Sequence, residues 1–112
     1  MLKIWTSSIK TFRGQNGLDV SVKGGDPIGR IFAPTWRIVI GVKQGTLTER
    51  DYELEYHRLM LESYSQHRDV WDSLLAKDEV VLLCYCKKGA FCRRLLLAQY
   101  LQKLGGDYCG EL

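Results

Sequence analysis

The sequence predicts a small α/β protein in which helices, in a two- or three-layer arrangement, cover a mainly parallel sheet of three or four strands. The run 80–83 is continuously apolar and partly β-branched, as in a strand that is buried on both faces. A short basic loop and an amphipathic helix follow this run, which is the order that a parallel sheet requires. An apolar fraction of 46% agrees with a folded chain, and 112 residues suffice for one domain, 1–112.

The N-terminal part predicts two strands, at residues 2–6 and 18–22. The first strand leads into Thr6 and Ser7, whose hydroxyls either hydrogen-bond a ligand or cap the next turn. The loop 23–27 contains a glycine pair beside a lysine and breaks the chain. Neither the spacing of a P-loop nor that of a dinucleotide-binding fingerprint is present.

Helices are predicted in the middle of the chain. Pro34 suits the first turn of a helix that begins near Trp36, and Gly45 ends it. The Trp36 side chain is either part of the core or a stacking surface for a ligand base. Residues 46–49 match the S/T-x-x-E capping box, so a second helix is predicted to open there.

The second helix carries Tyr52 and Tyr56 one turn apart on one face. At this spacing the two rings meet either the core or a ligand together. A third, short helix is predicted at 69–76, with its apolar side chains turned inward. These elements would precede the buried strand.

The C-terminal part predicts a helix and a last strand after the strand at 80–83. Apolar residues recur at helical spacing over 95–104, and Gly105 offers a left-handed end to this helix. A brief strand is predicted at 107–109. The resulting order is β-β-α-α-α-β-α-β, which favours a mainly parallel sheet.

The loop between the strand at 80–83 and the last helix is predicted to hold an anion, most simply phosphate. In an open α/β sheet, ligands bind outside the carboxyl ends of the strands, where the following helix directs unpaired N–H groups and partial positive charge. The alternative is a solvated basic loop that binds nothing. The predicted anion-binding residues are Cys86, Lys87, Lys88, Gly89, Phe91, Cys92, Arg93 and Arg94.

The net charge of +3, from 16 basic and 13 acidic residues, is mild. It suits a small anionic ligand and argues against a nucleic acid partner, which usually meets a denser basic face. No apolar run approaches the ~20 residues of a membrane span, and no signal peptide is recognisable, so a cytoplasmic protein is expected. A homodimer is compatible with the small size, although no residue establishes one.

Cysteine chemistry is an alternative hypothesis. The spacing from Cys86 to Arg93 is one residue longer than in the loops of cysteine-dependent phosphatases. Cys86 and Cys92 stay the alternative nucleophiles, because a helix N-terminus and nearby lysines activate a thiol. The spacing of Cys84, Cys86 and Cys92 differs from that of zinc sites, so no metal is predicted, and no cofactor is predicted either.

The C-terminal residues resemble the signature of the domain of unknown function 488 family. Cys84-x-Cys86 is followed by Gly89, Phe91, Cys92, an arginine and a leucine-rich helix. Earlier matches, to the short phage and bacterial branch of this family, are Thr6-Ser7, Gly25 with Pro27, and Ala33-Pro34-Thr35-Trp36.

The chain departs from the family pattern at three places. The family usually has a histidine where this chain has Arg93, and often an acidic residue where it has Cys86. A Ser-Arg pair that often precedes the glycine is Lys23-Gly24 here. The missing histidine argues against a histidine-dependent reaction, and the added positive charge favours holding an anion.

The first functional hypothesis is a non-catalytic protein that binds and sequesters a nucleotide-derived anion, such as an ADP-ribose-like or cyclic nucleotide signal. By analogy with small phage proteins that act as sponges for signals of bacterial defence, it would be a viral protein of immune evasion in the host cytoplasm. The alternatives are a cysteine-dependent enzyme acting on a nucleotide or phosphate ester, and a protein-interaction inhibitor of a host factor. Candidates for the sugar and base contacts are Thr6, Ser7, Trp36, Tyr52 and Tyr56.

Overall fold

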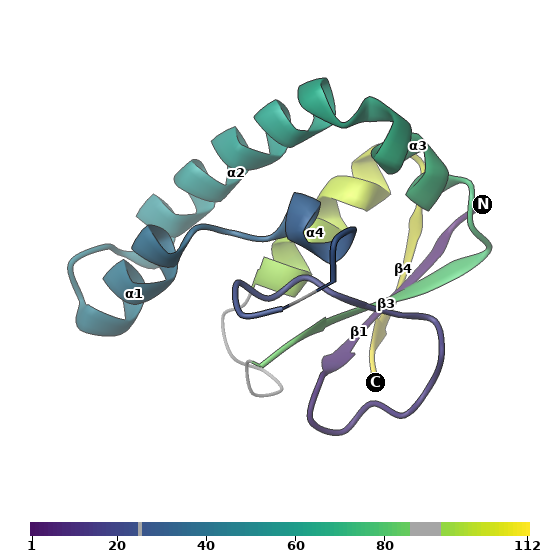
Figure 1. Ribbon diagram of the computed structural model, residues 1–112, viewed down its shortest axis with the longest axis horizontal. Helices are drawn as coiled ribbons and strands as arrows, with labels where there is room; N and C mark the ends of the chain where they lie inside the picture. The colour runs from purple at the N-terminus through teal and green to yellow at the C-terminus, as the bar shows by residue number, and fades with distance from the viewer. Residues whose placement is uncertain (25, 86–92) are drawn as a thin grey trace.

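The structure is a computed structural model that describes residues 1–24, 26–85 and 93–112 (Figure 1). The predicted order of strands and helices is confirmed, with one additional 3₁₀ turn after the second strand. In chain order the elements are β1 (Lys3–Ser8), β2 (Gly17–Asp19), the 3₁₀ turn η1 (Gly29–Phe32), α1 (Trp36–Gln44), α2 (Glu49–Gln66), α3 (Arg68–Leu75), β3 (Glu79–Cys84), α4 (Arg93–Lys103) and β4 (Asp107–Glu111).

The four strands form one sheet in the order β2-β3-β1-β4, and every neighbouring pair is parallel. The predicted small α/β fold with a mainly parallel sheet is therefore confirmed. Along the central pair, Ile4 lies opposite Val80. The ladder between β1 and β4 shifts its register between Ile4 and Trp5. Because all strands are parallel, their carboxyl ends lie at the same edge of the sheet.

The main core lies between the sheet and the helices. Ile4 of β1 and Leu82 of β3 point toward α4, whose Leu97 and Leu101 are fully buried against them. Burying a leucine or isoleucine side chain contributes roughly 1.5–3 kcal/mol, so this layer is the main source of stability. In Figure 1 the described helices lie together on one side of the sheet.

The opposite face of the sheet is covered in part by the segment that follows β1. Val81 and Leu83 are buried there, outside the cluster beneath the helices. The Phe12 ring and Leu83 meet at Gly17, where an added Cβ would lie 2.6 Å from Leu83 Cδ1 and 2.9 Å from Phe12 Cε2. The 9–16 segment thus replaces a helix as the cover of this face (Figure 1).

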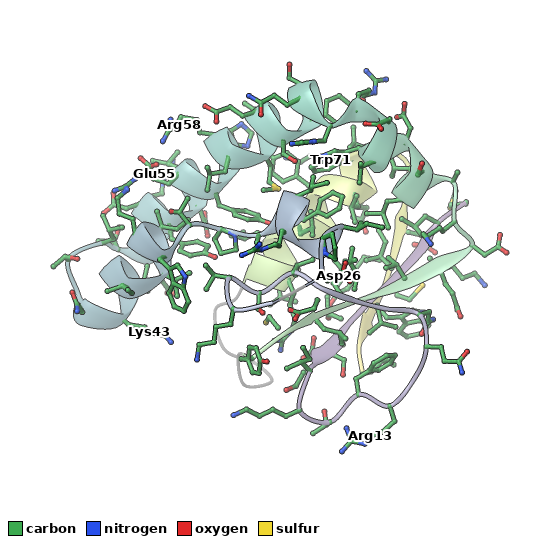
Figure 2. All side chains as sticks on the ribbon, in the orientation of Figure 1. Arg13, Asp26, Lys43, Glu55, Arg58 and Trp71 are labelled. Carbon is green, nitrogen blue, oxygen red and sulfur yellow. The ribbon has the colours of Figure 1, made fainter. Side chains whose placement is uncertain are left out.

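Helix α2 is held by hydrogen bonds from its inner face to the 3₁₀ turn. The Tyr56 hydroxyl donates to the Phe32 carbonyl at 2.8 Å, and Ser63 Oγ donates to the Ile31 carbonyl at 2.7 Å. Trp71 Nε1 of α3 donates to Ser63 Oγ at 3.0 Å. Figure 2 shows Trp71 beneath the helices, whereas Glu55 lies on the outer face of α2. Each buried polar atom of this layer has a partner, which removes the cost of desolvating it.

The predicted end of β2 and the predicted start of α2 were wrong. Strand β2 is shorter than the predicted 18–22, because the chain turns at Ser21, whose N–H and hydroxyl both donate to the Asp19 carboxylate. The capping box lies two residues later than predicted: Thr48 is the N-cap of α2 and pairs reciprocally with Asp51.

Thr46 belongs to the end of α1 instead of the start of α2. Its N–H and its hydroxyl both donate to the Gly41 carbonyl, at 2.9 and 3.2 Å. Gly45 makes this turn possible, since its φ of 76° is left-handed and costs a residue without Cβ little. Thr46 therefore stabilises the end of α1, and Thr48 is the N-cap at the start of α2.

Thr48→Ala is expected to lower the free energy of unfolding by about 1 kcal/mol, because an N–H at the start of α2 loses its side-chain acceptor. Thr48→Ser retains the acceptor and should stay within about 0.5 kcal/mol of the parent. Urea unfolding followed by circular dichroism measures both values. Equal stabilities of the alanine and serine variants would contradict the assignment of Thr48 as the N-cap.

Candidate functional site

Polar and charged side chains gather at the edge of the sheet where the strands end. Thr6 and Ser7 lie near the end of β1, Cys84 ends β3, and Glu111 ends β4. Thr6 is paired in register with Glu111, so these two side chains belong to neighbouring strands at the same level. Helix α4 begins at Arg93, and Arg94 in its first turn reaches the same edge.

Arg94 is fully buried and forms an ion pair with Glu111. Its Nη2 and Nε atoms donate to the two carboxylate oxygens of Glu111, at 2.6 and 3.2 Å, and its Nη1 atom donates to Cys84 Sγ at 2.7 Å. A fork of two parallel hydrogen bonds is the geometry that makes an arginine–carboxylate pair strong and directional. The pair therefore ties the first turn of α4 to the last strand.

The carboxylate of Glu111 is held in its ionised form. Burial by itself would raise the pKa of Glu111, but hydrogen bonds from Arg94 and Thr6 outweigh it and lower the pKa below the ordinary value of 4.5. The Thr6 hydroxyl also shares a hydrogen bond of 2.8 Å with the Tyr108 hydroxyl. Three strands and one helix thus contribute to a single polar network.

This network can position an anion site but offers little reactive chemistry by itself. The N–H groups of the first turn of α4 have no partners within the helix, and the helix dipole adds partial positive charge at the edge. Such an end is suited to phosphate or carboxylate. The Cys84 thiol is buried without exposed surface, so it is not placed to attack a ligand.

The structure brings together only part of the predicted ligand-binding set. Thr6 and Ser7 are buried at the carboxyl edge. Tyr52 and Tyr56 are buried beneath α2, with stacked rings whose centroids lie 6.1 Å apart. Trp36 is the first residue of α1, and 46% of its surface is exposed. The roles of these residues in binding a ligand stay predictions.

The predicted loop residues lie outside the described part of the chain. These are Cys86, Lys87, Lys88, Gly89, Phe91 and Cys92, together with the side chain of Arg93.

Among residues 1–24, 26–85 and 93–112, no group of three His, Cys, Asp or Glu side chains is placed to hold a metal ion. Over the same part of the chain, no helix combines the length and the apolar character that crossing a membrane requires.

Sequence reasoning missed the partners of Arg94. It ended the last strand at Cys109 and gave Glu111 no role, whereas β4 continues through that residue. An acidic residue at the end of a short C-terminal strand, in a chain with an arginine early in the preceding helix, is a signal that could have suggested the pair. The signal is weak, because neither spacing nor periodicity connects residues that are joined only through the sheet.

A protein-family model named DUF488-N3a, described as the active DUF488-N3 subclade, matches residues 12–105, well over half of the chain. The match includes β2, β3 and all four α-helices and leaves out β1 and β4. Thr6 and Glu111 therefore lie outside the matched region. Neither a curated protein nor a solved structure matches the chain.

Glu111→Gln is expected to destabilise the protein by about 3 kcal/mol at neutral pH, because it leaves the buried Arg94 guanidinium without a counter-charge. This is the lower end of the range for breaking a buried pair, since 17% of the Glu111 side chain is exposed. Glu55→Gln, which alters the surface ion pairs of Glu55 with Arg37 of α1 and Arg58 of α2, is the matched control and should change stability little.

The difference in the free energy of unfolding between wild type and Glu111→Gln should depend on pH. A carboxyl whose pKa is lowered by folding stabilises the protein above its unfolded pKa, and this contribution is lost as the pH falls through the folded pKa. The stability difference between the two proteins is therefore largest above about pH 5, and it decreases in more acidic solution. Urea unfolding of both proteins from pH 7 into the acid range measures it. A stability difference that does not change with pH would contradict the assignment of Glu111 as the ionised partner of Arg94.

Proposed function

The chain belongs to the DUF488 family, within the DUF488-N3a subclade, and we propose that it binds and sequesters a nucleotide-derived anionic ligand at the carboxyl edge of the sheet without converting it. The ligand class is an ADP-ribose-like or cyclic nucleotide signal, and the role is that of an anti-defence sponge of a phage. A location in the cytoplasm, that of the host if the chain is phage-encoded, and a homodimeric state belong to the same proposal.

The observation that carries the proposal is the fixed position of the α4 N-terminus at the edge where parallel strands end. Ligands of open α/β sheets bind in this place, because helix N-termini there offer N–H groups to anions. The buried pair of Arg94 and Glu111 holds the helix end against β4. A helix end that is held before binding loses less entropy when the ligand arrives.

The charge of Arg94 is balanced by Glu111, so the attraction for an anion has to come from other groups. The sequence supplies Lys87, Lys88 and Arg93 next to the helix end. Three cations and a helix dipole suit one or two phosphate groups. The mild net charge of +3 agrees with such a small ligand better than with a nucleic acid.

A cysteine-dependent reaction is a second candidate function. The description of the matched subclade as active favours a reaction of some kind, without naming its residues. In this case Cys86 or Cys92 would attack a phosphate or nucleotide ester, and the positive end of α4 would stabilise the thiolate.

Binding is tested with ADP-ribose, ADP and cyclic dinucleotides by thermal shift and calorimetry. A ligand at a hundred times its dissociation constant should stabilise the protein by about 2.7 kcal/mol. The Lys87→Ala/Lys88→Ala protein is expected to bind at least about tenfold more weakly, because it loses two cations near the phosphate. Arg94 is unsuitable for this test, since its replacement would break the buried pair.

The matched control is Lys3→Ala/Lys43→Ala, which removes the same charge from exposed positions at the start of β1 and in the last turn of α1. Its affinity should stay within about twofold of the parent. If both double variants lose affinity equally, the attraction is a property of net charge and not of the α4 end. If no compound in the panel shifts the melting temperature, the proposal is wrong.

Turnover is tested by chromatography of each bound compound after long incubation. Sequestration predicts that the ligand is recovered unchanged, because binding at the helix end involves no covalent step. If Cys86→Ser, Cys92→Ser or both variants no longer convert the ligand, the cysteine-dependent reaction replaces sequestration as the function. Conversion that persists in both variants would exclude these thiols as nucleophiles.

A further inference from the structure

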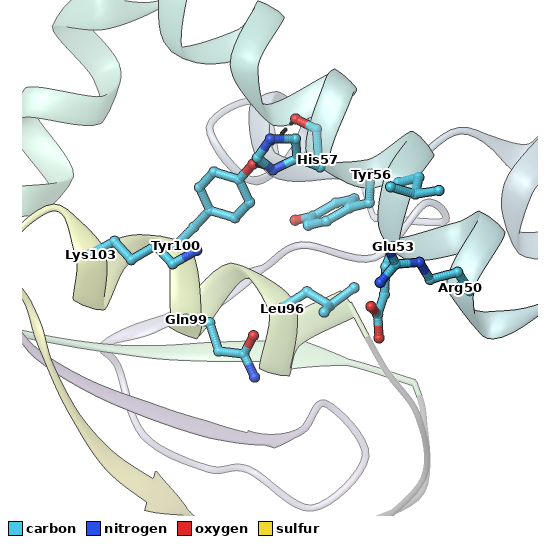
Figure 3. A pocket seen from close by; sticks show the side chains of 9 residues that line it. Arg50, Glu53, Tyr56, His57, Leu96, Gln99, Tyr100 and Lys103 are labelled. Atoms are coloured by element: carbon cyan, nitrogen blue, oxygen red, sulfur yellow. Dashed lines mark hydrogen bonds between the residues drawn. The ribbon is translucent and has the colours of Figure 1, made fainter.

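A groove of about 310 Å³ lies between α2 and α4, on the side of α4 that faces away from the sheet (Figure 3). Helix α2 contributes Arg50, Glu53 and His57 to its walls, and α4 contributes Leu96 and Gln99. Residues three and four apart share one face of a helix, so each helix presents a continuous strip to the groove.

The groove exists because α2 and α4 are held by different layers. α4 packs on the sheet through Leu97 and Leu101, whereas α2 is fixed to the 3₁₀ turn through Tyr56 and Ser63. The hydroxyl of Tyr100, on α4, is hydrogen-bonded to His57 Nδ1 of α2 and bridges the two helices toward one end. Figure 3 shows these two side chains pointing toward one another.

The walls combine three kinds of group. Tyr100 and His57 provide rings, with centroids 5.3 Å apart, beside the apolar surface of Leu96. Glu53 and Gln99 provide a carboxylate and an amide, which hydrogen-bond hydroxyls and the edges of bases. Rings for stacking together with groups for sugar hydroxyls are the requirements of a nucleoside.

Cations lie at both ends of the groove. Arg50 is in the first turn of α2, and Lys103 is in the last turn of α4, with its Nζ atom 6.0 Å from the centroid of the Tyr100 ring. Among the described lining residues these two cations face one carboxylate, that of Glu53. The groove therefore favours an anionic over a cationic ligand.

The groove begins within one turn of the candidate anion site. Leu96 follows Arg93 by three residues, which is about 4.5 Å along the helix axis, and Lys103 lies about 15 Å from the same point. A phosphate at the N-terminus of α4 and a base beside Tyr100 would thus be joined along one helix face.

We propose that this groove between α2 and α4 holds the nucleoside part of the ligand and is the specificity-determining subsite of the protein. The proposal rests on the proposed function and adds to it where the base and sugar bind. A volume of about 310 Å³ is at the lower end of small-molecule pockets, which span roughly 300–1,000 Å³, so one nucleoside fits and two do not. Tyr56 belongs to the lining but is only 1% exposed and its hydroxyl donates to the Phe32 carbonyl, so we assign it no direct ligand contact.

Two leucines of α2 provide a matched test. Leu54 lines the groove and is 55% exposed, whereas Leu61, two turns later, is 54% exposed and lies outside it. Either position accepts a larger side chain without disturbing the core. Leu54→Trp fills the groove, and Leu61→Trp makes the same change on open surface. Gln99→Trp fills the groove from α4. This second variant keeps the test valid if the indole ring introduced by Leu54→Trp rotates out into solvent.

The probes are ADP and inorganic pyrophosphate, measured by calorimetry. The wild-type protein should bind ADP at least about tenfold more tightly than pyrophosphate, because a stacked base adds to the phosphate contacts. Leu54→Trp and Gln99→Trp should each remove this advantage and leave the affinity for pyrophosphate unchanged. Leu61→Trp should leave both affinities unchanged.

The outcomes separate this inference from the function on which it rests. If the wild-type protein binds ADP and pyrophosphate equally, or if both groove variants bind ADP as the parent does, the groove is not the nucleoside subsite, while anion binding at the edge stands. If the wild-type protein binds neither probe nor any nucleotide, both proposals are wrong. Equal melting temperatures of the three variants confirm that the fold is intact.

Discussion

The buried ion pair of Arg94 and Glu111 is the interaction on which the arrangement of the carboxyl edge depends. It joins the first turn of α4 to the last strand, and through the hydrogen bond of Glu111 with Thr6 it also includes β1. Removing two charges from water costs several kcal/mol per ion, and two hydrogen bonds in a fork geometry offset that cost only when both partners are in place. Arg94 is therefore better understood as a residue that positions α4 than as a free cation.

The strand order explains how residues from the two ends of the chain join the candidate site. The family model matches only the residues between these ends. β4 adds to the sheet beside β1, so Thr6 and Glu111, at opposite ends of the sequence, become neighbours. Both lie outside the matched residues 12–105. With the described helices on one side of the sheet, α4 is covered by the sheet on one face and by α2 only in part on the other. The groove between α2 and α4 follows from this layering.

The elements of the fold that depend on local sequence could be predicted. The contacts that depend on pairing between distant residues could not. The apolar run 80–83 marks β3, and left-handed glycines end α1 and α4 as expected. The capping box was misplaced because two overlapping S/T-x-x-acid patterns lie in the sequence, and only the hydrogen bonds show that Thr48 is the cap. Arg94 and Glu111 are 17 residues apart and meet through a parallel sheet, which no periodicity records. The groove depends on the distance between two helices, and that distance is set by tertiary packing.

The position of positive charge in this chain agrees with the proposal that the ligand is retained and not converted. In the family signature that the C-terminal residues resemble, a histidine precedes an arginine, and an imidazole exchanges protons near neutral pH. A guanidinium in that place, Arg93, stays protonated and can attract an anion but cannot serve as a general base. The histidine that the structure places in the groove, His57, has its Nδ1 atom hydrogen-bonded to Tyr100 and thus helps to join α2 to α4. A helix end fixed by a buried pair, with a permanent charge in place of a titratable group, is compatible with the proposed binding function.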